Sequence, residues 1–154
     1  LIITMLVMFI GASPGSTAGG IKTTTAFVIY KSVIATIRGK KHIEFRKKTI
    51  PFELVDKSYS IMFMSALVIF ISVLAISIFE PTINFVNLLF ECVSAFATCG
   101  LSTGCTSSFT DPTKIILVIV MFIGRVGTLT FAFALSKRVK DTNHIYPSTY
   151  FMVG

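Results

Sequence analysis

The chain has 154 residues, of which 53% are hydrophobic, and its mean hydropathy of +0.82 is far above that of a soluble domain of similar length. Only 14% of the residues are charged, and lysine plus arginine outnumber aspartate plus glutamate by 14 to 7. The bases gather in one linker and one tail rather than on a folded basic surface, which excludes nucleic acid as a partner and favours a membrane protein in contact with lipid.

The first apolar segment, residues 1–10, runs into GASPGSTAGGIKTTT before the apolar pattern resumes as AFVIYKSVIATI. The glycines and Pro14 disfavour a continuous helix over residues 11–22. In lipid, irregular backbone is stable only where protein or a water-filled cavity satisfies its polar groups. We therefore expect residues 1–37 to form one membrane crossing, broken by an intramembrane loop at 11–22 that faces a pathway. Because Leu1 lies inside the apolar run, without the charged flank of a signal peptide, we also expect further chain upstream.

The basic residues predict the orientation of the chain. Eight of them lie between residues 31 and 57 and three follow residue 136, whereas residues 80–114 hold one. By the positive-inside rule, the linker at 38–57 and the tail at 137–154 are cytoplasmic. The linker charge either serves only to orient the chain or also docks a soluble partner, and the sequence leaves both open.

Two segments are long enough to span a bilayer. Residues 61–79 carry no charge, and we expect a helix at 58–79. A second spanning helix is expected at 112–136, with one charge, Arg125, near its middle.

A shorter apolar segment separates these two spans. Residues 83–96 amount to about 21 Å of helix, too little to cross, and they run into the small polar sequence ATCGLSTG. We expect a re-entrant half-helix at 83–97 and a turn at 98–103. Half-helix, glycine-containing turn and full helix make a pore loop. The predicted fold class is therefore an all-α membrane protein of helix, re-entrant pore loop, helix repeats with a broken helix at the start.

The turn after the half-helix has the chemistry to take up a dehydrated cation. Such a cation needs several oxygens directed at one axis, which backbone carbonyls supply. Gly100 permits backbone angles that turn carbonyls inward, and Thr98, Ser102 and Thr103 add hydroxyl oxygens. The alternative is a plain turn between helices, which the preceding half-helix makes the less favoured interpretation.

Arg125 needs an explanation because arginine at the centre of a spanning helix costs roughly 2.5 to 3.5 kcal/mol on insertion scales. Its side chain should therefore face protein or water. It is either a buried ion-pair partner or a charge facing a cavity below the turn, where it would raise a barrier to cations and act as a gate.

No enzyme or metal site is predicted. Gly15 and Gly20 have the spacing of a phosphate-binding loop, but Ile21 occupies the lysine position and Lys22 follows it. No catalytic triad or pair of carboxylates stands out for acid–base work. The cysteines and histidines have no metal-ligand spacing: Cys92, Cys99, Cys105, His42 and His144.

The pentapeptide VMFIG occurs twice, at residues 7–11 and 120–124. Five identical consecutive residues in two helical segments indicate an internal repeat. Transport folds commonly form their sites at the interface between repeats.

Three stretches, VMFIGASPGSTAGGIKTTT, FECVSAFATCGLSTG and MFIGRVGTLTFAFAL, resemble the Trk/Ktr family of potassium-uptake membrane subunits, and the closing HIYPSTYFMVG resembles its carboxy terminus. The resemblance covers nearly the whole chain. It implies four consecutive helix, pore loop, helix repeats around one pore, in a multi-pass protein of the cell membrane. Residues 1–37 would be the second helix of the third repeat and residues 58–136 the fourth repeat.

The resemblance also implies the site residues. The family's selectivity filter maps onto Thr98, Cys99, Gly100, Leu101 and Ser102, and potassium would bind through the backbone oxygens of the first three. Cys99 stands where the family often has an aliphatic residue, with little expected effect because backbone oxygens coordinate the ion. The intramembrane gate, which Arg125 would hold shut, maps onto Gly11, Ser13, Pro14, Gly15, Ser16, Thr17, Gly19, Gly20 and Lys22.

The implied function is gated permeation of potassium, with sodium left open because the filter lacks the aromatic residue and second glycine of TVGYG filters. The implied partners are the remainder of the same subunit, a second copy in a homodimer, and a cytosolic ring of regulatory subunits. Nucleotide would bind only to that ring, and this chain would need no cofactor. Two alternatives stay open: a secondary cation-coupled transporter with a broken-helix substrate site, and a non-conducting assembly subunit.

Overall fold

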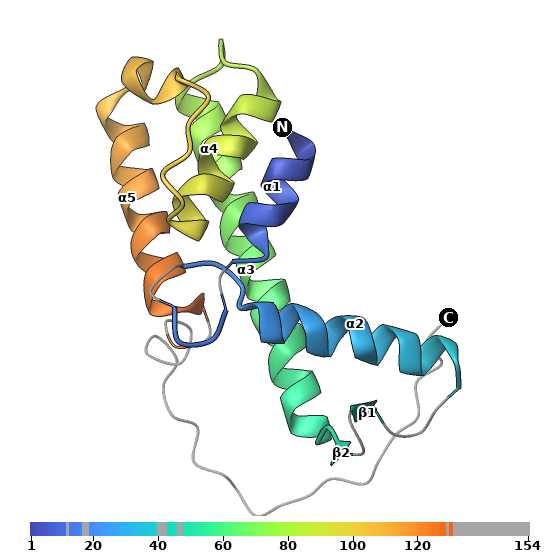
Figure 1. Ribbon diagram of the computed structural model, residues 1–154. Coiled ribbons are helices and arrows are strands. Elements are labelled where there is room, and N and C mark those ends of the chain that lie inside the picture. Colours follow the sequence, from blue (N-terminus) through green and yellow to red (C-terminus); the bar gives the residue numbers. More distant parts are fainter. Residues whose placement is uncertain (12, 17–18, 40–42, 46–47, 129, 131–154) are drawn as a thin grey trace, which may run out of the picture.

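The computed structural model describes residues 1–11, 13–16, 19–39, 43–45, 48–128 and 130 (Figure 1). The elements in chain order are helix α1 (Ile2–Phe9), helix α2 (Thr23–Ile37), strands β1 (Glu44–Phe45) and β2 (Lys48–Thr49), helix α3 (Phe52–Phe79), helix α4 (Phe85–Ala97), the single 3₁₀ turn η1 (Cys105–Ser108) and helix α5 (Asp111–Val126). The predicted all-α class is confirmed, since the two short strands are a minor addition.

Helix α4 lies at the centre of a small bundle and contacts α1, α3 and α5 (Figure 1). It begins after Asn84, whose side-chain oxygen accepts a hydrogen bond from the amide of Val86 at 3.0 Å, a typical N-cap. Every residue from 90 to 97 is buried. A 13-residue helix held inside a bundle agrees with the half-helix expected at 83–97.

Helix α3 is 28 residues long, or about 42 Å. In the described part of the chain it is the one helix long and apolar enough to cross a membrane, judged by length and composition. It begins six residues before the expected position 58, because Pro51 has a dihedral angle suited to a helix start and Val55 is already buried. The last residues of the linker expected at 38–57 therefore belong to the first turns of α3.

Helix α2 runs sideways across the lower part of α3 instead of continuing the direction of α1 (Figure 1). The Tyr59 hydroxyl of α3 donates a hydrogen bond to the Ser32 hydroxyl oxygen of α2 at 3.2 Å. In the linker, β1 pairs antiparallel with β2, and the ring of Phe45 lies 4.9 Å from that of Phe27 on α2, edge to face. Residues 1–37 thus form two helices of different direction joined by a loop.

Helix α5 ends at Val126, and residues 128 and 130 are again helical, so the expected helix at 112–136 is interrupted at Gly127. Gly127 has a φ of 95° and a ψ of 129°, a conformation that is open to glycine alone without strain. Residues 131–136 and the tail at 137–154 lie outside the described residues, as do His42 and His144.

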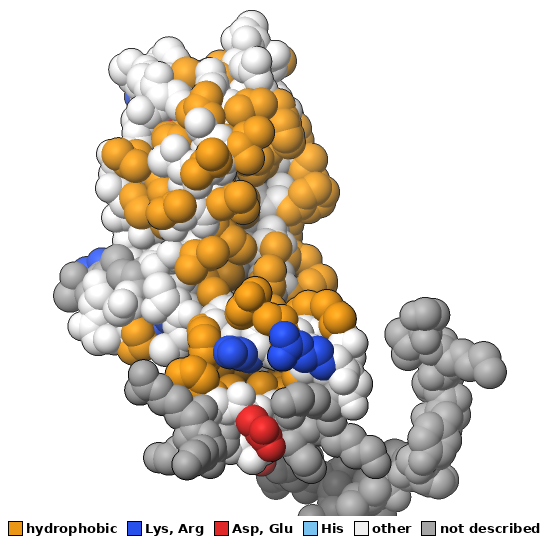
Figure 2. All heavy atoms as spheres, turned by 45° about the vertical axis from the view of Figure 1, so that its right-hand side comes forward, with side chains coloured by type: hydrophobic (Ala, Val, Ile, Leu, Met, Phe, Trp, Pro, Cys, Tyr) orange, Lys and Arg blue, Asp and Glu red, His pale blue; other side chains and the backbone are white. Residues whose placement is uncertain are grey.

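The outer faces of the helices are apolar. Figure 2 shows hydrophobic side chains in a broad band along the bundle, with Lys and Arg side chains collected below it. Large exposed side chains include Phe63, Phe70 and Ile78 on α3 and Ile119 and Phe122 on α5. A soluble monomer rarely exposes such a surface, whereas contact with lipid or with further membrane-embedded protein would cover it.

Candidate pore loop and gate

The turn that follows α4 is built by three left-handed backbone positions. Thr98 caps the helix with a φ of 53° and a ψ of 34°, and Gly100 and Gly104 follow with φ of 73° and 90°. The amide of Cys99 still donates to the carbonyl of Ser94 at 3.2 Å. The chain therefore leaves the helix abruptly at Thr98, and Gly100 reverses its course at little cost.

The predicted filter residues lie together on this turn and are open to their surroundings. Cys99, Gly100, Leu101 and Ser102 are exposed, and Thr98 is half-buried. The carbonyl of Leu101 accepts a hydrogen bond from the Ser94 hydroxyl, so this carbonyl is directed at α4. Leu101 is therefore tied to α4 through its carbonyl.

The predicted gate loop contacts the first residue of the predicted filter. The amide of Gly19 donates a hydrogen bond to the Thr98 hydroxyl oxygen at 3.0 Å. Gly19 is buried, and a Cβ atom there would lie 2.9 Å from that oxygen and 3.1 Å from the carbonyl oxygen of Phe96. Gly20, with a φ of 83°, passes beside Ala97. Only glycine lets the loop pass this close beneath the end of α4.

The two glycines of the VMFIG repeat have matching roles. A Cβ atom on Gly11 would collide with the carbonyl oxygen of Gly19, and one on Gly124 would collide with the carbonyl oxygen of Phe96. At each of these glycines, two backbone segments of the chain therefore lie in direct contact. The loop is further fixed by the amide of Ile21, which donates to the carbonyl of Phe9 at 3.3 Å.

Four further predicted gate residues belong to the exposed part of the loop. Ser13, Pro14, Gly15 and Ser16 are exposed and form a turn in which the Ser16 amide donates to the Ser13 carbonyl at 3.1 Å. Thr17 lies outside the described residues. The structure thus brings Gly19 and Gly20 to the end of α4, and Gly11 packs against these two glycines.

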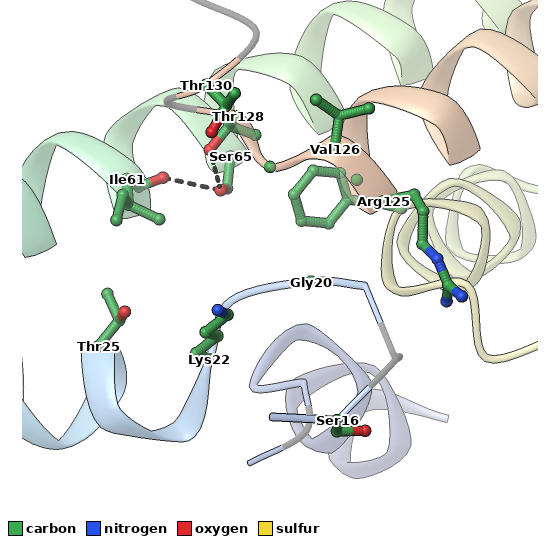
Figure 3. Close-up of a pocket in the computed structure, with 13 residues that line it drawn as sticks. Ser16, Gly20, Lys22, Thr25, Ile61, Ser65, Arg125, Val126, Thr128 and Thr130 are labelled. Atoms are coloured by element: carbon green, nitrogen blue, oxygen red, sulfur yellow. Dashed lines mark hydrogen bonds between the residues drawn. The ribbon is translucent and has the colours of Figure 1, made fainter. Parts of the chain in front are cut away.

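A cavity of about 500 Å³ lies between the loop, α3 and the end of α5 (Figure 3). It is rich in hydroxyl groups, and two of them, on Ser65 and Thr128, lie 3.2 Å apart in a buried pair. Lys22 lines the cavity from the loop and Arg125 lines it from the last turn of α5. The other lining residues are Ser16, Gly20, Thr25, Ile61, Phe96, Gly124, Val126, Gly127 and Thr130.

Arg125 therefore lines this cavity, and its role as a gate stays a prediction. Its side chain is exposed in the described part of the chain. Among the described residues of α5, Lys114 and Asp111 form an ion pair at 3.6 Å, but this pair lies at the end of the helix opposite to Arg125. Two cationic side chains beside one hydroxyl-lined cavity raise the local potential and oppose the entry of a cation.

Glu91 is a further residue of this site, and the sequence motifs did not single it out. Glu91 is buried within α4 and its carboxylate accepts hydrogen bonds from Ser102, the last predicted filter residue, and from Thr103 and Thr106. The pattern that could have revealed it is a single acid within the otherwise apolar half-helix INFVNLLFECVSAF, because an ionisable residue at such a place is costly without a purpose.

The chain matches the family model described as TrkH, cation transport protein, over residues 1–144. It is 40% identical over 154 residues to the Ktr system potassium uptake protein B of Bacillus subtilis, covering 100% of this chain and 34% of that protein. The Ktr system potassium uptake protein B of Vibrio alginolyticus is 36% identical, with 100% of this chain and 33% of that protein covered. The potassium/sodium uptake protein NtpJ of Enterococcus hirae is 34% identical, with 100% and 35% covered.

The fold resembles the crystal structure of the potassium transporter TrkH from Vibrio parahaemolyticus. The TM-score is 0.74 at 19% sequence identity, and the match covers 88% of this chain and 31% of that chain. The chain spans about a third of the length of the curated relatives it matches.

Proposed function

This chain belongs to the TrkH family of cation transport proteins, and from this we propose that it contributes one filter segment and a gate to a pore that carries potassium across the cell membrane. The observation that carries the proposal is the contact between the glycine loop and the end of the half-helix, where Gly19 donates to Thr98 at 3.0 Å. A closable pore needs such a contact, because the obstruction must lie directly on the path below the filter.

In this proposal the ion binds to the backbone carbonyl oxygens of Thr98, Cys99 and Gly100. Carbonyl oxygens replace the hydration shell of a monovalent cation without adding charge, which permits both binding and release. Potassium is the first candidate because the Bacillus subtilis and Vibrio alginolyticus relatives are named potassium uptake proteins. Sodium is the second, since the Enterococcus hirae relative is named for both ions.

The gate comprises the loop and the charges beside it. Gly11, Gly19 and Gly20 let the loop pack beneath α4, and Lys22 and Arg125 add positive charge at the cavity. Closure then combines a steric obstruction with an electrostatic barrier, and opening requires the loop to leave Thr98. In this scheme the exposed residues Ser13, Pro14 and Gly15 move with the loop.

The whole subunit would be a multi-pass membrane protein whose basic linker at 38–57 and tail at 137–154 are cytoplasmic. The linker would meet a cytosolic regulatory subunit that binds nucleotide, since two relatives are named as parts of a Ktr system. A homodimer of the subunit completes the proposed assembly. The secondary-transporter alternative is less favoured, because a buried half-helix ending in an open turn suits a pore better than an occluded substrate site.

Replacement of Gly100 by serine in the intact subunit tests the filter. Gly100 has a φ of 73°, which serine adopts only with strain, so the neighbouring carbonyls should turn and the preference for rubidium over sodium should fall. Gly39→Ser is the matched control, because Gly39 has a similar φ of 63° but lies in the linker, away from the filter. Uptake ratios of both ions in vesicles are the measurement. An unchanged ratio in Gly100→Ser would contradict the assignment.

A further inference from the structure

Glu91 is 5% exposed and lies in α4, two turns before the filter begins. Its oxygen Oε1 accepts hydrogen bonds from the Ser102 hydroxyl at 2.7 Å, the Thr103 amide at 2.7 Å and the Thr103 hydroxyl at 2.9 Å. The other oxygen, Oε2, accepts from the Thr106 hydroxyl at 3.0 Å. One carboxylate therefore collects four donors, all from residues 102–106.

This arrangement suits an ionised carboxylate, which has acceptor sites only. A buried carboxylate without such donors would be costly, and hydrogen bonds to a charged acceptor are stronger than those to a neutral one. These hydrogen bonds therefore hold the segment 102–106 against α4. The amide of Gly104, which donates to the Ser102 hydroxyl oxygen at 2.9 Å, tightens the same segment.

The filter turn is consequently held at both ends. At its lower end, Thr98 caps α4 and accepts from Gly19. At its upper end, the Leu101 carbonyl accepts from Ser94, one helical turn after Glu91 on the same side of α4. Cys99 and Gly100 lie between the two attachments.

We propose that Glu91 is a positioning residue for ion selectivity: its carboxylate holds residues 102–106 against α4 and thereby sets the spacing and direction of the Thr98, Cys99 and Gly100 carbonyls. The inference rests on the proposed function of this turn as a filter. Selectivity depends on the geometry of the carbonyls, so a residue that never touches the ion controls it through the attachment of the turn.

The test compares four variants of the intact subunit in vesicles. Glu91→Gln keeps the volume of the side chain but removes its charge, and Thr106→Val removes the donor to Oε2 while leaving the carboxylate. Glu80→Gln is the matched control, because Glu80 is another buried carboxylate that accepts from Thr110 and Thr113, at 2.7 and 3.4 Å, outside the filter. Glu91→Gln combined with Thr106→Val completes a double-mutant cycle.

The readouts are the ratio of rubidium to sodium uptake and the thermal unfolding midpoint. We expect the ratio to fall roughly tenfold in Glu91→Gln, the factor that corresponds to one lost hydrogen bond to a charged group. Thr106→Val should also lower the ratio of rubidium to sodium uptake. In the double variant, the fold-decrease in this ratio should be smaller than the product of the fold-decreases in the two single variants. Glu80→Gln should lower the unfolding midpoint and leave the ratio unchanged.

A wild-type ratio in Glu91→Gln, or in Thr106→Val if Glu91→Gln does not fold, would overturn the positioning role. An equal loss of selectivity in Glu80→Gln would also overturn it, because the effect would then follow from lost stability alone. If the filter assignment itself is wrong, the ratio should also be insensitive to Gly100→Ser, and this result distinguishes that failure from the two outcomes above.

Discussion

The amide of Gly19 donates a hydrogen bond to the Thr98 hydroxyl oxygen at 3.0 Å, across 79 positions of the sequence. Thr98 is at once the cap of the half-helix and the first predicted filter residue, and Gly19 belongs to the loop that breaks the first membrane segment. A single hydrogen bond thus couples the proposed gate to the proposed filter. Movement of the loop removes a partner from the residue that starts the filter.

Thr98→Val should open the gate more often. Valine has the shape of threonine but cannot accept the Gly19 hydrogen bond, and a buried amide left without an acceptor costs about 1 to 3 kcal/mol. Basal rubidium flux through the intact subunit should rise up to about tenfold, and the rubidium to sodium ratio should stay constant because the backbone carbonyls are retained. Thr98→Ser keeps the hydroxyl and should behave as wild type. A lower flux in Thr98→Val with normal expression would contradict the coupling.

Arg125→Ala should also increase flux, for an electrostatic reason. The substitution removes one of two cationic side chains at the cavity and so lowers the barrier to a permeating cation. We expect an increase of about 2- to 10-fold in vesicle flux, larger at low ionic strength because salt screens the charge. Lys114→Ala is the control, since Lys114 is a cation at the far end of α5 and pairs with Asp111.

Deletion of residues 15–20 tests the steric part of the gate separately. It removes the glycines that pack beneath α4, so flux should rise even where Arg125 is retained. Unchanged or abolished flux in a correctly expressed deletion variant would argue that the loop supports the pore rather than obstructs it.

The cysteines provide a built-in accessibility test. Cys99 is exposed at the filter and Cys92 is fully buried in α4, and both are free thiols. A positively charged thiol reagent should modify Cys99 and block most of the flux, because the added charge then lies beside the ion path. Cys99→Ser should conduct and resist the reagent. Block that persists in Cys99→Ser would place the sensitive thiol elsewhere, with half-buried Cys105 as the first suspect.

Gly124→Ala should destabilise the packing of α5 against α4. A Cβ atom at this position collides with the carbonyl oxygen of Phe96, which is backbone and cannot rotate away. We expect a loss of about 1 to 3 kcal/mol in the free energy of unfolding, visible as a lower thermal midpoint. Val118→Ala changes an exposed side chain of the same helix and should have a much smaller effect. Equal midpoints for the two variants would show that α5 shifts without cost.

Sequence reasoning found the half-helix, the turn after it and the loop near residue 11 because these follow from local properties. A 14-residue apolar segment cannot span a bilayer, and a run of glycines around Pro14 cannot remain helical, whatever surrounds them. The ends of helices α3 and α5 were harder to predict from the sequence. Whether α3 starts at 52 or 58 depends on burial, since Val55 is already buried, and the helix is interrupted at Gly127 by a backbone angle that an apolar pattern does not reveal.

The pore-loop order of half-helix, turn and helix, with a glycine-rich break before it, was determined by the sequence alone, because segment length and backbone propensity act within a few neighbouring residues. Only the tertiary structure decided that Gly19 meets Thr98, that both VMFIG glycines mark backbone contacts and that the Glu91 carboxylate accepts hydrogen bonds from residues 102–106. These contacts join residues that are distant in sequence or separated by a change of direction. They depend on how helices pack in space, which composition and periodicity do not specify.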